Sequence, residues 1–220
     1  RGAGAFSTPW KNLLARFAEA NPWRGRDLAA LVALVALAQF IRSRLPASLA
    51  ADVLAFQGVI AVGVLGLARR KTRPFGAPAP LRAVAGQAVL RWLALLPLLW
   101  FVAFTWQVVL EALGHPPDLQ EAIRLFIEAG NGRRRIAFLL FAVVLAPVAE
   151  EMLFRGILLP LLVRHAGAAA GLVLTAFGFA ALHGHLGTFV PLAAMSIALS
   201  LAYARTGTIL VPMAMHALFN

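Results

Sequence analysis

The sequence predicts an all-α protein, a polytopic transmembrane helical bundle of about seven or eight membrane helices. Hydrophobic residues make up 61% of the 220 residues and charged residues only 13%, and the mean hydropathy is +0.81. A soluble domain carries roughly 25% charged residues and about 45–50% apolar ones, so a soluble globule of this length could not bury so much apolar surface. The same composition excludes a disordered chain, because low hydrophobicity keeps a chain unfolded.

The formal net charge of +11 does not indicate a nucleic-acid partner. Eighteen of the 20 basic residues are Arg, and they form short clusters between apolar runs. This pattern is typical of residues that hold helix ends at a membrane surface, so the expected partner is the lipid bilayer. The absence of Cys excludes disulfides, Cys-ligated zinc and thiol nucleophiles.

Residues 1–26 are expected to form an N-terminal interfacial helix, with a loose tail as the alternative. Thr8 and Pro9 are typical of an N-cap and a first helical position. The apolar side chains that follow, from Trp10 to Phe17, share one face, which is the pattern of a helix lying on a membrane.

Residues 27–135 are expected to hold the N-terminal transmembrane helices and their loops. The apolar runs of this part are Leu28–Ile41, Ala47–Ala68 and Trp92–Leu113. A basic, Pro-rich loop at 69–80 separates the second run from the third. Residues 114–131 form a polar linker that contains a short amphipathic segment, Asp118–Glu128.

Residues 136–220 are expected to form the transmembrane core that carries the chemistry. Its apolar runs are Ile136–Ala149, Ile157–Val163, Ala166–Leu182, Phe189–Ala204 and Ile209–Phe219. The first two should form one long helix, because Glu150–Gly156 between them contains no loop chemistry. Turns are expected at 165–168 and 205–208. Only 12 residues follow Thr208, too few for a span of roughly 20, so we expect the natural chain to continue.

The distribution of Lys and Arg predicts a cytoplasmic N-terminus. If the seven helices that these runs predict alternate across the membrane, 13 basic residues fall on the side of the N-terminus and six on the other. Cytoplasmic loops carry the excess of Lys and Arg. The Ala/Leu/Arg-rich composition is typical of high-GC coding, so we expect the inner membrane of a bacterium.

Three charged residues, Glu150, Glu151 and Arg155, lie inside a predicted membrane helix. Each costs about 2.5–3.5 kcal/mol there even on the mildest scale, and such residues are functional by default. The structural alternative is a compensated pair of Glu151 and Arg155 at i, i+4. It leaves Glu150 without a partner in the sequence, which favours function.

Three histidines, His183, His185 and His216, lie in or near apolar helices, whereas His115 and His165 look like loop residues. Residues 150 and 183 are equidistant from the turn at 165–168, roughly 25 Å along their helices. Measured along the last helix from the turn at 205–208, His216 lies roughly 14 Å and Asn220 roughly 20 Å from that turn. These two residues share one helix face. Four polar residues from three helices are therefore expected in one layer near the middle of the bilayer.

Such a layer predicts hydrolysis. A carboxylate and a His can take a proton from water, while a second His and an Asn amide can donate to the oxyanion that forms at an attacked carbonyl. Glu150, His183 and His216 are also the ligand types of a catalytic zinc site, and the spacing does not decide between the two.

The residues resemble the CPBP family of intramembrane proteases (CAAX proteases and bacteriocin-processing enzymes, also called the ABI family). Glu150–Arg155 matches its E-E-x-x-x-R motif, Phe179–His183 its F-x-x-x-H motif and His216–Asn220 its H-x-x-x-N motif, in the family's order. The resemblance covers about Ile136 to Asn220, and each motif alone is weak.

The resemblance implies that Glu150 and His183 activate the water and that His216 and Asn220 stabilise the oxyanion. Supporting roles fall to Glu151, Arg155 and Phe179, the first two orienting the site. The family was first described as metalloproteases, and its prenyl-protein members look able to work without metal. We expect no catalytic metal here, with zinc as the alternative, and we expect His185 to have a packing or interfacial role.

The resulting expectation is an intramembrane endopeptidase that cuts a membrane-associated protein or peptide, entering from the membrane, near its C-terminus. The candidate substrates are prenylated CAAX-type ends, or the sorting tails and leader peptides of bacterial exported proteins, which we favour. The alternative is a non-catalytic immunity or scaffold protein of the same fold. A transporter is less favoured, since the chain has no internal repeat.

Overall fold

The computed structural model describes residues 9–45, 57–115, 118, 126–127 and 132–220. In this part of the chain the regular structure is helical, and the one β-type contact is an isolated antiparallel bridge between Gly76 and Thr208. The predicted all-α class is confirmed. Thr8, most of the amphipathic segment Asp118–Glu128 and the first part of the run Ala47–Ala68 lie outside the described residues.

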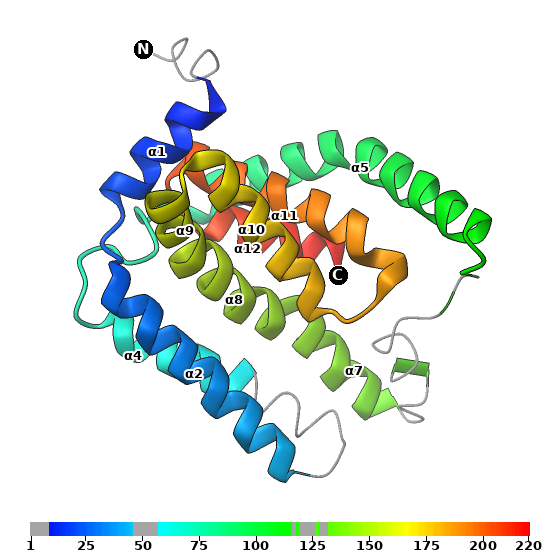
Figure 1. Cartoon of the computed structure of the whole chain (residues 1–220), viewed down its shortest axis with the longest axis horizontal. Helices are drawn as coiled ribbons and strands as arrows, with labels where there is room; N and C mark the ends of the chain where they lie inside the picture. The colour runs from blue at the N-terminus through cyan, green and yellow to red at the C-terminus, as the bar shows by residue number, and fades with distance from the viewer. Residues whose placement is uncertain (1–8, 46–56, 116–117, 119–125, 128–131) are drawn as a thin grey trace.

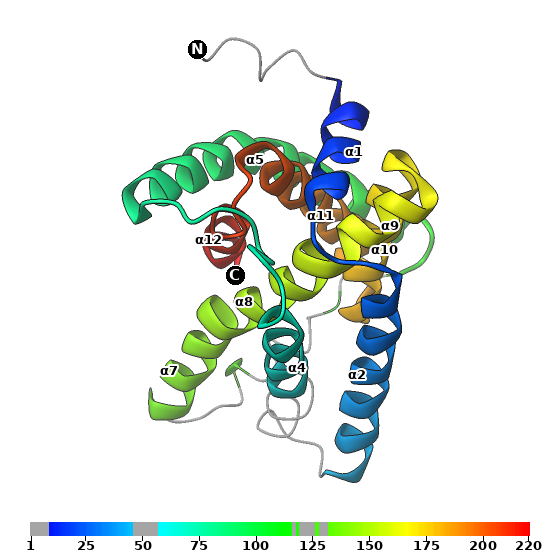
Figure 2. The same cartoon turned by 90° about the vertical axis from the view of Figure 1, so that its left-hand side faces the viewer.

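Helix α1 (Trp10–Ala20) confirms the predicted N-terminal helix, with Pro9 at the N-cap, one residue later than expected. Its apolar face is packed on protein: Leu14 and Ala18 form a buried cluster with residues of α9 and α10. Figures 1 and 2 show α1 at the upper end of the bundle, beside α9 and α10. A position of α1 at the membrane interface stays a prediction.

The C-terminal end of α1 is held by Arg164, which lies in the last turn of α9. The Arg164 guanidinium donates hydrogen bonds to the backbone carbonyls of Ala18, Asn21 and Trp23. The last carbonyls of a helix have no partner within the helix and carry partial negative charge. Arg164 therefore places a cation at this end of α1, bonded to Ala18 within the last turn and to Asn21 and Trp23 beyond it, and connects the N-terminal helix to the core.

The predicted basic, Pro-rich loop at 69–80 is confirmed, since it joins α4 (Val59–Ala68) to α5 (Leu81–Ala112). Two contacts tie it to the start of α2 (Gly25–Arg44). The Trp23 indole Nε1 donates to the Pro74 carbonyl at 3.0 Å, and the Lys71 ammonium lies 2.8 Å from the Asp27 carboxylate. The loop is thereby fixed to the end of the bundle at which α2 begins.

Helix α5 begins 11 residues before the apolar run that predicts it at Trp92. Arg82 and Arg91, which lie between the predicted loop at 69–80 and this apolar run, are helical. The prediction of this boundary was wrong because hydropathy reports apolar content, whereas the helix starts after Pro80, whose ring suits a helix start. The charged first turns of α5 simply precede its apolar part.

A single continuous helix confirms the joining of the two apolar runs at Ile136 and Ile157. Its successive segments are α7 (Gly132–Leu140), η2 (Phe141–Leu145), α8 (Ala146–Glu151), η3 (Met152–Leu158) and α9 (Leu159–Ala166). In Figure 1 it crosses the molecule diagonally from green to yellow. The η segments are π-helical, with i→i+5 hydrogen bonds, a conformation that is rare and frequent at functional sites. The paired glutamates end α8, and Arg155 lies in η3.

Three further helices, α10 (Ala168–Leu182), α11 (Leu186–Thr206) and α12 (Leu210–Phe219), complete the core. The two predicted turns are confirmed, with Gly167 at φ +84° and Gly207 at φ +68°, where glycine carries no Cβ penalty. His165 is in the last turn of α9 rather than in a loop, because the helix continues to Ala166. His115 follows the end of α5, as predicted.

Three of the described helices are long and apolar enough to cross a membrane: Leu81–Ala112, Arg135–Ala166 and Leu186–Thr206. On α5 the side chains of Trp100, Phe101 and Phe104 are 66–74% exposed, and such large apolar surface indicates contact with lipid. Helices α4, α10 and α12 are apolar but shorter. The predicted total of seven or eight membrane helices stays a prediction.

The long helix lies at the centre of the fold. The pair α2 and α4 packs on one side of it, while α10, α11 and α12 lie on the other, with α5 across α11 and α12 (Figures 1 and 2). The largest buried cluster joins residues of both sides around η3. The charged stretch of the long helix is therefore surrounded by other helices.

Candidate functional site

The core of the site is a buried ion pair within the long helix. The Arg155 Nη1 lies 2.8 Å from the Glu151 Oε1, and both side chains are 0% exposed. The guanidinium also donates to the Ser196 carbonyl on α11 at 3.3 Å and lies over the Phe179 ring, 4.5 Å from its centroid. Buried charges in proteins are paired, so the pairing that i, i+4 spacing predicts is confirmed.

His216, on α12, lies between the two glutamates. Its Nδ1 is 2.8 Å from the Glu151 Oε1, and its Nε2 is 3.8 Å from the Glu150 Oε2. A carboxylate oxygen only accepts hydrogen bonds, so the Nδ1 donates to Glu151 and the ring orientation is fixed. The side chain is almost fully buried, and its free nitrogen is directed toward Glu150.

Glu150 is half-buried, and a second helix contacts it. The side-chain amide of Gln57 donates from Nε2 to the Glu150 Oε1 at 3.0 Å. Gln57 is not among the predicted site residues, although the sequence carries a signal for it, an amide inside the apolar run Ala47–Ala68. Polar side chains in membrane helices face the bundle interior and find partners there, so this residue was a candidate for the site.

Phe179 lies between the two histidines of the motifs. Its ring centroid is 4.9 Å from that of His183 and 5.6 Å from that of His216. His183 follows the last residue of α10, where it is exposed, and its Nδ1 is 2.8 Å from the Phe179 carbonyl oxygen. Because a carbonyl only accepts, the Nδ1 is the donor, and the Nε2 of the neutral ring is left as an acceptor.

Asn220 follows the last residue of α12, one helical turn after His216. Its side chain is exposed, and its Nδ2 donates to the Ala142 carbonyl in η2 at 2.8 Å. This contact places the end of α12 against the long helix, two turns before Glu150. Figure 1 shows the same arrangement, with the C-terminus near the middle of the molecule.

The structure therefore connects Glu150, Glu151, Arg155 and His216 by direct contacts. Phe179 links His183 to this cluster, and Asn220 reaches it through the backbone of the long helix. The histidine placed beside Glu150 is His216, while the side-chain contacts of His183 are with Phe179.

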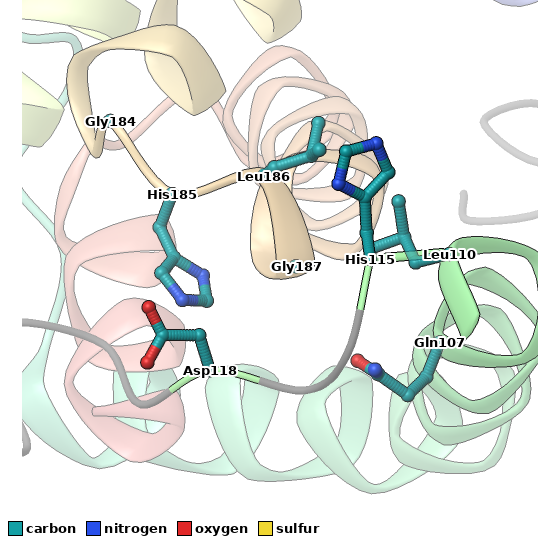
Figure 3. A pocket seen from close by; sticks show the side chains of 8 residues that line it. All are labelled: Gln107, Leu110, His115, Asp118, Gly184, His185, Leu186 and Gly187. Carbon is teal, nitrogen blue, oxygen red and sulfur yellow. The ribbon is translucent and has the colours of Figure 1, made fainter. Parts of the chain in front are cut away.

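His185 lies in a neighbouring cavity of about 520 Å³, not in the cluster. The cavity lies between the end of α5 and the connection from α10 to α11. In Figure 3 the side chains of His185 and Asp118 point toward one another across it. Its lining residues are Gln107, Leu110, His115, Asp118, Gly184, His185, Leu186 and Gly187. Gly184 directly follows His183, so the cavity begins beside the site.

Glu150, His183 and His216 are the residues that would hold zinc in the alternative interpretation of the site. Among the described residues no group of three or more His, Cys, Asp or Glu side chains is arranged to hold a metal ion. These three residues therefore do not fit a metal in the arrangement that the structure has. Independence of metal stays a prediction.

Fold and site together define the class of the protein. It is an integral membrane protein of apolar helices, and its interior holds a polar cluster of two glutamates, an arginine and a histidine. Residues 132–220 match the family model described as type II CAAX prenyl endopeptidase Rce1-like. The resemblance to CPBP proteases is thereby confirmed, and at the level of the family it supports a CAAX-type intramembrane endopeptidase. No curated protein and no solved structure matches the chain.

Proposed function

We propose that the chain is an intramembrane endopeptidase of a bacterial inner membrane, which hydrolyses a peptide bond near the C-terminus of a membrane-associated protein or peptide. The observation that carries the proposal is the position of the Glu150 carboxylate beside the His216 Nε2, with Glu151 and Arg155 behind them. The family match supports the reaction class. The favoured substrates are sorting tails and leader peptides of exported proteins.

In the proposed reaction Glu150 is the general base. A water molecule at its Oε2 attacks the carbonyl carbon of the peptide bond and gives its proton to the carboxylate. The neutral His183 ring, with its Nδ1 donating to Phe179, has an Nε2 that accepts the water's second hydrogen bond. Glu150, Glu151 and Arg155 carry a summed formal charge of −1, which a doubly protonated His216 beside them would balance.

His216 and Asn220 are the proposed donors to the oxyanion. With a proton on both ring nitrogens, His216 donates from Nδ1 to Glu151 and from Nε2 into the site. The Asn220 amide has a second N–H besides the one that donates to Ala142. One such donor typically contributes about 10²–10³ in rate. Glu150 then passes its proton to the peptide nitrogen as the C–N bond breaks, which leaves a carboxylic acid and an amine and restores the Glu150 carboxylate.

Glu151 and Arg155 position this machinery. Glu151 accepts from His216 and from Arg155 at the same oxygen, each at 2.8 Å. Since Arg155 is also bound to Ser196 and lies over Phe179, the imidazole is fixed through contacts with three helices. A catalytic group must be held within roughly half an ångström of its working position, and this arrangement supplies that support.

The test compares protein termini in host membranes from cells that carry the wild type, Glu150→Gln or no enzyme. New termini that appear only with the wild type are expected, because the amide cannot accept the proton and the loss of a general base costs about 10²–10⁴ in rate. Glu111→Gln is the matched control, since Glu111 is exposed at the end of α5, and this variant should cleave like the wild type.

The opposite result is also informative. Identical termini in all three membranes, with Glu150→Gln still restoring the phenotype of a deletion strain, would refute hydrolysis. That outcome would favour the non-catalytic alternative, an immunity or scaffold protein that binds its partner with the same fold.

A further inference from the structure

We propose that Gln57 is a positioning residue of this site, which anchors one oxygen of Glu150 so that the other faces the reacting groups. The inference rests on the proposed function. The contact is direct, 3.0 Å from the Gln57 Nε2 to the Glu150 Oε1, and it joins residues 93 positions apart in the chain. Residues 57–58 are helical and lead into α4.

The contact comes from outside the family domain. The family match begins at residue 132, whereas Gln57 precedes α4, which packs against α8 and η3. Figure 2 shows α4 below α8, next to the middle of the long helix. The N-terminal helices therefore do more than enclose the core, because one of them contributes a side chain to the site.

The two oxygens of Glu150 have different surroundings. Oε1 accepts from Gln57, while Oε2 faces the His216 Nε2 at 3.8 Å. A glutamate side chain has several rotatable bonds, and a single anchored oxygen removes most of its freedom. Since a misplacement of about 1 Å can cost about 10² in rate, the anchor matters for the step in which Oε2 takes a proton.

An amide suits this position better than a charged group. It donates without titrating, so it remains a donor at any pH, and it adds no charge to a membrane helix. A carboxylate in its place would repel Glu150, because like charges disfavour ionisation of a shared site. An apolar side chain of the same length would fill the space and leave Oε1 without its donor.

The test uses Gln57→Met, which keeps the length and removes the donor, and Gln39→Met as the matched control, because Gln39 is exposed on α2. The probe is an internally quenched peptide that spans the cut located by the comparison of termini. For Gln57→Met we expect kcat to fall about 10- to 100-fold with KM within about two-fold of the wild type. The unfolding midpoint should match that of the control.

A purely structural role for Gln57 predicts a different result. In that case the unfolding midpoint falls, and kcat per folded enzyme equals that of Gln39→Met. Either this pattern, or an unchanged kcat together with an unchanged unfolding midpoint, would overturn the inference about Gln57. The proposed function would stand in both cases, because the wild type would still cleave the peptide.

A second measurement separates this inference from the proposed function. The carboxylate stretching band of Glu150, identified in infrared spectra by its loss in Glu150→Gln, should shift in Gln57→Met and stay in place in Gln39→Met. This readout needs no hydrolysis. A wild type that cleaves nothing would refute the proposed function alone, whereas an unshifted band in Gln57→Met would refute the contact.

Discussion

Replacing Arg155 by Met removes the guanidinium charge of the buried cluster and keeps an unbranched apolar stem. Glu151 and Arg155 are both 0% exposed and 2.8 Å apart. Opposite unit charges about 4 Å apart attract by roughly 4 kcal/mol at an effective dielectric constant of 20. Removing one partner of a buried pair costs about 3–5 kcal/mol, because Glu151 then keeps its buried charge with only the His216 Nδ1 as a partner. We expect Arg155→Met to lower the free energy of unfolding by this amount.

The assay is equilibrium unfolding in mixed micelles, read by the fluorescence of the five Trp residues. The double variant Glu151→Gln with Arg155→Met removes both charges, so it should lose at least 1 kcal/mol less than Arg155→Met alone, because no unpaired charge remains. If the double variant is as unstable as the single one or more so, or if Arg155→Met costs less than about 1 kcal/mol, the reasoning from an unpaired buried charge is refuted.

Two further predictions concern packing and capping. A Cβ on Gly171 would lie 2.4 Å from the Val163 backbone nitrogen, whereas one on Gly178 meets its nearest neighbour, Phe154, at 3.9 Å. Gly171→Ala should therefore destabilise the protein by about 1–3 kcal/mol in unfolding titrations. Gly178→Ala should be neutral or more stable by up to about 1 kcal/mol. Equal free energies of unfolding for the two variants would refute the close approach at Gly171. Arg164→Met should weaken the end of α1 by about 1–2 kcal/mol. The effect would be measured as faster amide hydrogen exchange in α1, and cleavage should be retained. Unchanged exchange would contradict the role of Arg164 at the end of this helix.

The elements that the sequence predicted correctly are those that local signals determine. The turns at Gly167 and Gly207 follow from a glycine at the end of an apolar run, where a left-handed residue ends the helix. The long helix through Glu150 follows from the absence of a loop sequence between two apolar runs. The match of three short motifs in one order singled out Glu150, Glu151, Arg155 and His216, which the fold connects by direct contacts.

The features that the sequence did not predict depend on neighbours in space. The contact of Gln57 with Glu150 joins two segments 93 positions apart, and no periodicity in either segment encodes it. The π-helical segment η3 arises where Arg155 is buried among other helices, which is a tertiary effect. The start of α5 was misplaced because Arg82 and Arg91 are helical without being apolar.

The buried charges also bear on how the protein is made. Glu150, Glu151 and Arg155 enter the membrane on the long helix, whereas Ser196 and His216 are synthesised later, on α11 and α12. Until those helices arrive, the insertion penalty of about 2.5–3.5 kcal/mol for each charge is relieved by the pairing of Glu151 with Arg155 and by the hydrogen bond from Gln57 to Glu150. The contacts with Ser196 and His216 form only when α11 and α12 dock, so the compensation of the buried charges is completed after the long helix has been made.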